Sequence, residues 1–286
     1  MTQAPTALVT GCSSGIGRAT ALRLHAAGYT VYATARKPET LTALTALGMH
    51  ALALDVTDPA SARAAVERIE SEHGAVDVLV NNAGYGLSGT FEETGLDQVR
   101  EQFETNVFGL VGLTQLVLPG MRGRGRGTVV NVSSIFGKYA VPGGGYYHAS
   151  KHAVEALSDA LRLEVAGFGI RVVVVEPGPV RTPWGQTFLD RIPDGRSRAG
   201  SPYARFHERA AAYYDAIYNG TRRTLAGTFA IEAEQVAEAI EKAVRRRRPR
   251  ARYPVGFLAA STIALRRVAP DRIFDSAFIR RQFPVP

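Results

Sequence analysis

The sequence predicts an α/β fold in which one parallel sheet carries helices on both faces. Segments with strand signals alternate with segments with helix signals to about residue 175, and crossovers of that kind join parallel strands. A glycine-rich turn also separates the first strand from the first helix. The 286 residues suit one α/β domain with a large core, so we take 1–286 as a single domain.

The N-terminal strand, turn and helix predict a site for a dinucleotide. Residues 6–10 form a short apolar strand, and Gly11-Cys12-Ser13-Ser14-Gly15-Ile16-Gly17 leads from it into an apolar helix. The first turn of a helix offers unpaired N–H groups and the positive end of the dipole to a pyrophosphate. Glycine at 11 and 15 permits the turn and a close backbone approach, and glycine at 17 lets the helix pack on the strand.

The end of the second strand indicates which dinucleotide is bound. Residues 30–34 lead into Ala35-Arg36-Lys37, where an acidic residue would bond the ribose hydroxyls of NAD, and none is present. Arg36 and Lys37 offer two cations to a 2′-phosphate, and Ser14 offers a hydroxyl. We therefore expect NADP(H) to be preferred, with NAD(H) as the weaker ligand. The alternative is that both cations are only solvated loop charges.

Tyr147 and Lys151 predict a proton-transfer site. Four residues apart on a helix, they lie on the same face. A free phenol keeps its proton until about pH 10, and a lysine cation within ~4–6 Å lowers that pKa. A tyrosine so placed can act as general acid and base. Upstream, Ser134 and Asn106 add a hydroxyl and an amide. The alternative is an ordinary exposed helix pair.

Together these features resemble the short-chain dehydrogenase/reductase family over about residues 6–185. The motifs that carry the resemblance are Thr10-Gly11 with Gly15-Ile16-Gly17, Asn81-Asn82-Ala83-Gly84, the set Asn106, Ser134, Tyr147 and Lys151, and Pro177-Gly178-Pro179-Val180-Arg181-Thr182. The chain is most similar to the 17β-hydroxysteroid-dehydrogenase-like branch. The resemblance implies a Rossmann-type, doubly wound sheet of about seven strands.

The resemblance also implies a role for each matching residue. Ser134 and Tyr147 would bond the substrate carbonyl, Lys151 the nicotinamide ribose, and Asn106 a water in a locally distorted helix. The family spacing selects Ser134 rather than Ser133, which we expect to bond the backbone. The implied cofactor-binding residues are Gly11, Ser13, Ser14, Gly15, Ile16, Gly17, Arg36, Lys37, Asp55, Val56, Asn82, Ala83, Gly84, Tyr147, Lys151, Pro177, Gly178, Val180 and Thr182.

In this family the segment after the Pro-Gly motif sets the substrate, here a lid over about residues 183–230. We expect Phe136 and four residues of the lid to contact the substrate: Trp184, Phe188, Tyr213 and Tyr214. Tyr213, Tyr214, Ile217 and Tyr218 recur at helical spacing, which favours an aromatic lid helix or, alternatively, ordinary core packing. Four arginines could instead receive an anionic group: Arg181, Arg191, Arg196 and Arg198.

The resemblance implies an NADP(H)-dependent reductase that converts a bulky apolar ketone or aldehyde to an alcohol, reversibly. One alternative is non-redox chemistry, such as cyclisation, epimerisation or dehydration. Another is a cofactor-sensing protein, against which the retained Tyr147 and Lys151 argue. The family usually forms homodimers or homotetramers through the helices that carry Asn106 and Tyr147.

Composition bounds the remaining classes. Cys12 is the only cysteine, which excludes a disulfide framework and a cysteine-based metal site, and we expect no metal. The first strand begins at once and no apolar run reaches about 18 residues, so we expect a cytoplasmic protein without a signal peptide or spanning helix.

Two charged segments allow alternative interpretations. The net charge is +8, and residues 245–252 are rich in arginine. That run could bind nucleic acid, but we expect it only to complement a helix C-terminus before Pro249 stops the helix. The C-terminal extension, 253–286, is amphipathic with basic flanks. It could contact a membrane surface, although we favour a cover for the substrate pocket or a subunit interface.

Overall fold

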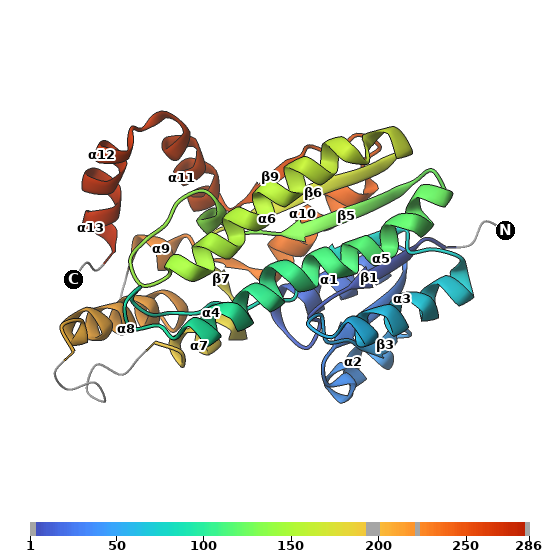
Figure 1. Cartoon of the computed structure of the whole chain (residues 1–286), viewed down its shortest axis with the longest axis horizontal. Coiled ribbons are helices and arrows are strands. Elements are labelled where there is room, and N and C mark those ends of the chain that lie inside the picture. Colours follow the sequence, from blue (N-terminus) through green and yellow to red (C-terminus); the bar gives the residue numbers. More distant parts are fainter. Residues whose placement is uncertain (1–3, 193–200, 221–223, 284–286) are drawn as a thin grey trace.

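The computed structural model describes residues 4–192, 201–220 and 224–283 and contains one large parallel sheet (Figure 1). Its seven strands run in the order β3-β2-β1-β4-β5-β6-β9, and every neighbouring pair is parallel. The strands are β1 Thr6–Val9, β2 Thr30–Ala35, β3 His50–Ala53, β4 Val78–Asn81, β5 Gly127–Val132, β6 Ile170–Pro177 and β9 Arg252–Val255. The predicted doubly wound sheet is confirmed.

Helices cover both faces of the sheet because alternate strand residues point to opposite sides. Ala7 and Val9 pack with one set of helices, whereas Leu8 packs with the other. The first set is α1 Gly15–Ala26, α2 Thr42–Thr45 and α10 Ala233–Arg245. The second set is α3 Pro59–His73, α5 Gly109–Gly123 and α6 Gly145–Glu164.

The remaining elements gather beyond the carboxyl ends of the strands (Figure 1). They are α4 Leu96–Phe103, β7 Val180–Arg181, α7 Pro183–Leu189, α8 Ala204–Tyr218, α9 Leu225–Thr228, β8 Ile231–Glu232, α11 Phe257–Val268, α12 Asp271–Phe274 and α13 Arg280–Gln282. Short 3₁₀ turns are η1 Pro38–Leu41, η3 Ile135–Gly137 and η4 Ala166–Phe168, and π turns are η2 Glu104–Phe108 and η5 Asp275–Ile279. Within the described ranges, no helix is long and apolar enough to cross a membrane.

Helix α10 ends earlier than the sequence predicted. It stops at Arg245, and Arg246 already has extended backbone angles, so Pro249 does not terminate it. Arg171, on β6, donates a hydrogen bond to the carbonyl of Arg246 and holds the chain at that point. The chain then returns to the sheet as β9, which pairs with β6 at the edge.

Candidate active site

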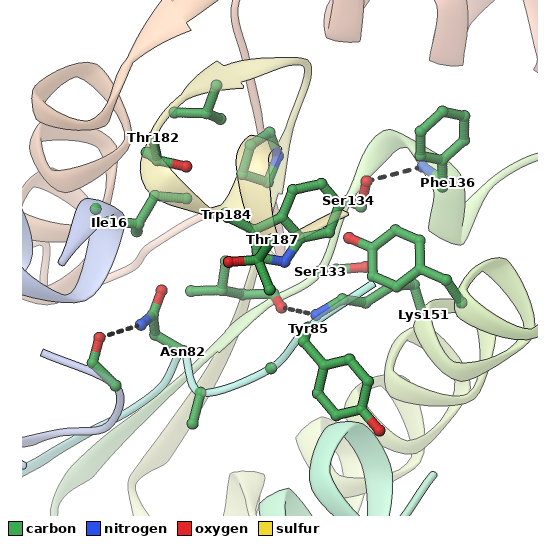
Figure 2. A pocket seen from close by; sticks show the side chains of 18 of the residues that line it. Ile16, Asn82, Tyr85, Ser133, Ser134, Phe136, Lys151, Thr182, Trp184 and Thr187 are labelled. Atoms are coloured by element: carbon green, nitrogen blue, oxygen red, sulfur yellow. Dashed lines mark hydrogen bonds between the residues drawn. The ribbon is translucent and has the colours of Figure 1, made fainter. Parts of the chain in front are cut away.

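A cavity of about 770 Å³ opens at the carboxyl edge of the sheet. The loops after β1, β2, β3, β4, β5 and β6 form one part of its wall, and α4, η2, α7, α8 and the C-terminal segment also contribute to it. In Figure 2, Ile16 and Thr182 lie on one side of this space and Ser134, Phe136 and Lys151 on the other, with Trp184 between them. Carboxyl ends of parallel strands are where ligands bind in folds of this class.

The glycine-rich loop lines the cavity at the N-terminus of α1. Gly11 and Gly15 have φ angles of 72° and 55°, which side chains rarely adopt. Ser14 is the N-cap of α1, and its side chain makes no capping hydrogen bond. The first N–H groups of the helix, beside the cavity, therefore have no side-chain acceptor from Ser14. Gly17 is the one predicted loop residue outside the lining. A Cβ there would lie 2.2 Å from the carbonyl oxygen of Gly11, so Gly17 packs the helix on the loop.

The loop after β4 is fastened to the glycine-rich loop. The hydroxyl of Thr10 accepts hydrogen bonds from the backbone N–H groups of Asn82 and Ala83, both at 2.9 Å. Asn82 Nδ2 donates to the carbonyl of Thr10 at 2.8 Å. The predicted Asn82, Ala83 and Gly84 therefore all reach the cavity wall.

At the end of β2 only one of the two predicted cations reaches the cavity. Arg36 lines it, together with the predicted Asp55 and Val56, but Lys37 does not. The lining therefore favours Arg36 over Lys37 as the cation for a 2′-phosphate. Successive residues of an extended chain point to opposite sides, and Lys37 has extended backbone angles.

Ser134, Tyr147 and Lys151 are brought together, and burial dominates their protonation. The three side chains line the cavity and are buried. Burial raises the pKa of Tyr147 to about 12, and a hydrogen bond with Ser134 acts in the opposite direction. Burial also lowers the pKa of Lys151 to about 8, opposed by Glu155. Lys151 Nζ donates to the carbonyl of Val132 at 2.9 Å.

This electrostatic result corrects the prediction that Lys151 brings the phenol pKa down. Lys151 Nζ lies 5.9 Å from the centroid of the Tyr147 ring, close enough to act. The same burial that disfavours the phenolate also disfavours the ammonium, so the lysine charge does not outweigh the effect of burial on the phenol pKa. Tyr147 in this structure keeps its proton far above neutral pH.

The two neighbouring serines both line the cavity. Ser134 Oγ accepts a hydrogen bond from the N–H of Phe136 at 3.1 Å (Figure 2). Ser133 Oγ is buried with no hydrogen-bond partner among the described residues, so the prediction that it bonds the backbone is wrong. Both serines follow the end of β5 at Val132, so the alternation of side chains along a strand does not separate them.

Asn106 lies behind the cavity wall, within the π turn η2. Its Nδ2 donates to the carbonyl of Tyr85 at 2.9 Å and to Ser150 Oγ at 3.1 Å, and its Oδ1 accepts from the N–H of Tyr85 at 3.1 Å. A Cβ on Gly84 would lie 3.0 Å from Asn106 Oδ1 and 3.8 Å from Lys151 Nζ. Asn106 thus fixes the loop beside Lys151.

Most predicted substrate residues line the cavity. Phe136, Trp184, Tyr213 and Tyr214 do, but Phe188 does not. Phe188 is buried behind Trp184, with ring centroids 5.4 Å apart and nearly parallel planes, so it supports the wall from outside. The predicted Pro177, Gly178, Val180 and Thr182 also line the cavity.

The four candidate arginines differ in position. Arg181 bonds Glu232 at 3.0 Å and the carbonyls of Ala230 and Gly227, so its charge is engaged outside the cavity. Arg191 lines the cavity and lies 4.2 Å from the ring centroid of Tyr85. Arg196 and Arg198 lie outside the described residues.

Sequence reasoning missed part of the cavity wall, notably Tyr85, Tyr139, Phe278 and Phe283. None of them belongs to a motif. The amphipathic pattern of the C-terminal extension was the only signal for Phe278 and Phe283, and it predicted a cover without showing which residues face inward.

Comparison with known proteins agrees with this geometry. A family model described as short chain dehydrogenase matches residues 5–192. The chain belongs to the short-chain dehydrogenase family. It is therefore an oxidoreductase of that family, with a single α/β domain.

Three relatives illustrate the range of similar proteins. The chain is 35% identical over 272 residues to the short-chain type dehydrogenase/reductase VdlC of Helicobacter pylori, covering 95% of this chain and 96% of VdlC. It is 34% identical to an NADPH-dependent 3-dehydrocapnine reductase of Ornithobacterium rhinotracheale, covering 96% of each. It is 33% identical to retinol dehydrogenase 5 of Mus musculus, covering 94% of this chain and 86% of that protein. The last similarity is consistent with the predicted hydroxysteroid-dehydrogenase-like branch.

Two solved structures share the fold. A short-chain dehydrogenase from Streptomyces avermitilis has a TM-score of 0.75 and 35% identity, covering 92% of each chain. A serine dehydrogenase in its closed form, complexed with NADP+, has a TM-score of 0.73 and 27% identity, covering 88% of this chain and 94% of that one.

Proposed function

We propose that this chain is an NADP(H)-dependent oxidoreductase that reduces a ketone or aldehyde of a bulky apolar compound to an alcohol, reversibly. The observation that carries the proposal is one cavity that joins three features. Ser134 and Tyr147 line it, and so do the glycine-rich loop with Arg36 and a group of aromatic side chains. A carbonyl oxygen between the two hydroxyls would accept hydrogen bonds from both.

The glycine-rich loop and the residues near it fit an NADP(H) molecule. The uncapped N-terminus of α1 suits a diphosphate, and the Arg36 fork suits the 2′-phosphate. Asp55 and Val56 would hold the adenine end, and Asn82, Ala83 and Gly84 would pack beside the cofactor. Tyr147 and Lys151 would hold the nicotinamide ribose, and Pro177, Gly178, Val180 and Thr182 the nicotinamide end. The bound cofactor supplies hydride to the carbonyl carbon. The NADP+ complex and the NADPH-dependent relative support this choice.

The protein's own part is to hold the carbonyl and move a proton. Because burial raises the pKa of Tyr147 to about 12, its hydroxyl is protonated at neutral pH and can protonate the developing alkoxide. Ser134 would orient the carbonyl oxygen, and the Lys151 ammonium would stabilise negative charge on the phenol. Asn106 would keep the loop beside Lys151 in place.

We also propose that the lid, residues 183–230, and the C-terminal extension, 253–286, form the substrate side of the site. Trp184, Tyr213 and Tyr214 of the lid line the cavity, as do Phe278 and Phe283 of the extension. A wall of aromatic rings favours a large apolar compound.

An NADPH oxidation assay tests the proposal on bulky ketones, aldehydes and quinones. We expect turnover to fall about a hundred- to ten-thousand-fold in Tyr147→Phe, because the proton donor is removed. Tyr146→Phe is the matched control, since the Tyr146 hydroxyl bonds the Phe91 carbonyl at 3.0 Å and lies outside the cavity lining. Product formed without NADPH consumption would show non-redox chemistry instead.

A further inference from the structure

Aromatic rings from the lid form a continuous wall that starts at Tyr147. The Trp184 ring lies 5.5 Å from Tyr147, and Tyr218 lies 6.2 Å from Trp184, measured between centroids. Tyr214 follows at 6.5 Å from Tyr218, and Tyr213 at 5.3 Å from Tyr214. All of these residues line the cavity.

A second wall starts at the same tyrosine and runs along the opposite segments. Phe136 lies 6.4 Å from Tyr147, Tyr139 lies 5.4 Å from Phe136, and Phe278 lies 6.0 Å from Tyr139. Each of these residues also lines the cavity.

Both walls meet at Phe283 near the C-terminus. Its ring lies 5.3 Å from Tyr213 on the first wall and 6.4 Å from Phe278 on the second. Three separate parts of the chain therefore close an aromatic ring, with the proton donor at one end and Phe283 at the other. We call this set of side chains the aromatic ring of the cavity.

Charge is absent from the aromatic ring itself. The charged side chains that line the cavity come from other places: Arg36, Asp55, Glu101, Glu104, Lys151 and Arg191. Lys151 Nζ lies 5.9 Å from the centroid of the Tyr147 ring and donates a hydrogen bond to the carbonyl of Val132. Arg191 lies over Tyr85, which does not belong to the ring. A charged group among these aromatic side chains would lack a partner, and burying it would be costly.

The aromatic ring nevertheless contains hydrogen-bonding groups that have no protein partner. The hydroxyls of Tyr139, Tyr213, Tyr214 and Tyr218 bond no side chain or backbone group within the described ranges. All four residues line the cavity. Burial raises the pKa of all four, so they are neutral donors and acceptors. Buried polar groups in proteins normally have a partner.

We propose that the aromatic ring is the substrate compartment and that it takes an uncharged, largely apolar compound with a second oxygen group remote from the reacting carbonyl. The second group would be a hydroxyl, ketone or ester that the free phenols bind. This inference rests on the proposed function, because the reacting carbonyl is placed at Tyr147. It adds a requirement that bulk and apolarity alone do not impose, and it makes Phe283 part of the substrate site.

Trp184 gives a direct measure of binding. It is the only tryptophan of the chain and lies within the aromatic ring, so its fluorescence reports occupancy without any turnover. Three matched probes separate the effects of the apolar chain, a remote hydroxyl and a remote charge on affinity. They are undecyl methyl ketone, the same ketone with a terminal hydroxyl, and the same ketone with a terminal carboxylate. We expect the hydroxyl to lower Kd about three- to tenfold, which is the effect of one neutral hydrogen bond, and the carboxylate to raise it.

A variant in which Tyr139, Tyr213, Tyr214 and Tyr218 are all changed to Phe keeps the apolar wall and removes the hydroxyls. We expect its Kd for the plain ketone to be unchanged and its preference for the hydroxylated ketone to disappear. The four single Tyr→Phe variants give the same comparison if the combined variant does not fold. Tyr253→Phe is the control, because the Tyr253 hydroxyl accepts from Arg250 and lies outside the cavity lining.

The outcomes separate this inference from the proposed function. Three results would overturn the proposed substrate compartment. They are equal affinity for the plain and hydroxylated ketones, tight binding of the carboxylate, and an unchanged preference in the Phe variants. Binding with the expected preference but without NADPH oxidation would uphold the compartment and overturn the reductase.

Discussion

Arg36 is the cation at the end of β2 that faces the cavity, whereas Lys37 beside it does not. If Arg36 binds the 2′-phosphate, Arg36→Ala should raise KM for NADPH about ten- to a hundredfold, as expected for loss of a charge-assisted hydrogen bond. KM for NADH should change little, and Lys37→Ala should leave both values near those of the native enzyme. Steady-state kinetics with each cofactor measure this. Equal losses for both cofactors would show that Arg36 does not read the phosphate.

Lys151 predicts the alkaline limit of the reaction. Its pKa is lowered to about 8 and that of Tyr147 is raised to about 12, so Lys151 loses its charge first as the pH rises. In the proposed reduction Tyr147 must be protonated and Lys151 must carry its charge, so kcat/KM should fall above about pH 8. Lys151→Arg keeps the charge and should move that limb to higher pH. If the fall in kcat/KM stays at the same pH in the Lys151→Arg variant, the titrating group is not Lys151.

At the scale of elements, the contact of α1 with the glycine-rich loop depends on Gly17. An alanine Cβ there would lie 2.2 Å from the Gly11 carbonyl oxygen and 2.6 Å from Asn82 Nδ2. Gly17→Ala should lower the free energy of unfolding by about 1–3 kcal/mol through overpacking. It should also weaken cofactor binding, because the displaced loop is the proposed diphosphate site.

Gly112→Ala in α5 is the matched control for that substitution. Its Cβ would meet nothing within 4 Å, so it should stabilise the helix by about 0.5–1 kcal/mol. Urea unfolding of both variants measures the difference. A Gly17→Ala protein as stable as the native chain would show that α1 can shift away from the loop.

For the whole molecule, Arg252 ties the last strand of the sheet to α6 and β6. Its guanidinium lies 3.0 Å from Glu155, 2.6 Å from Asp159 and 3.3 Å from Glu176, which is fully buried. Lys138 also bonds Glu176, at 3.1 Å, and burial raises the pKa of that carboxyl. Removing one cation from such a cluster leaves buried negative charge incompletely paired.

Arg252→Ala should therefore lower the free energy of unfolding by about 3–5 kcal/mol. Arg248→Ala, an exposed residue of the same basic run, should change it by less than about 0.5 kcal/mol. Denaturant unfolding distinguishes them, and similar effects would refute the structural role. Arg245 also bonds a carboxylate, Glu241 at 2.9 Å, so both ends of the run are engaged within the protein. The expected absence of nucleic-acid binding and the expected dimer or tetramer stay predictions.

The sequence by itself determined the parallel sheet, the glycine-rich loop and the pairing of Tyr147 with Lys151, and the family resemblance added Ser134. Each depends on local order: strand and helix periods, glycine where φ is positive, and two side chains one helical turn apart. Parallel strands then bring their carboxyl ends to one edge, so residues far apart in the chain meet there.

Only the tertiary structure decided which of the candidate side chains face the cavity. It also decided the protonation state of Tyr147. Lys37 and Phe188 lie outside the lining and Ser133 lies inside it, because those positions depend on where strands end and how α7 packs. The pKa of Tyr147 rises because burial, which no local pattern encodes, outweighs the nearby lysine. The far wall of the cavity is likewise a long-range product: Tyr139 and Phe278 meet only because the C-terminal segment folds back over the carboxyl edge of the sheet.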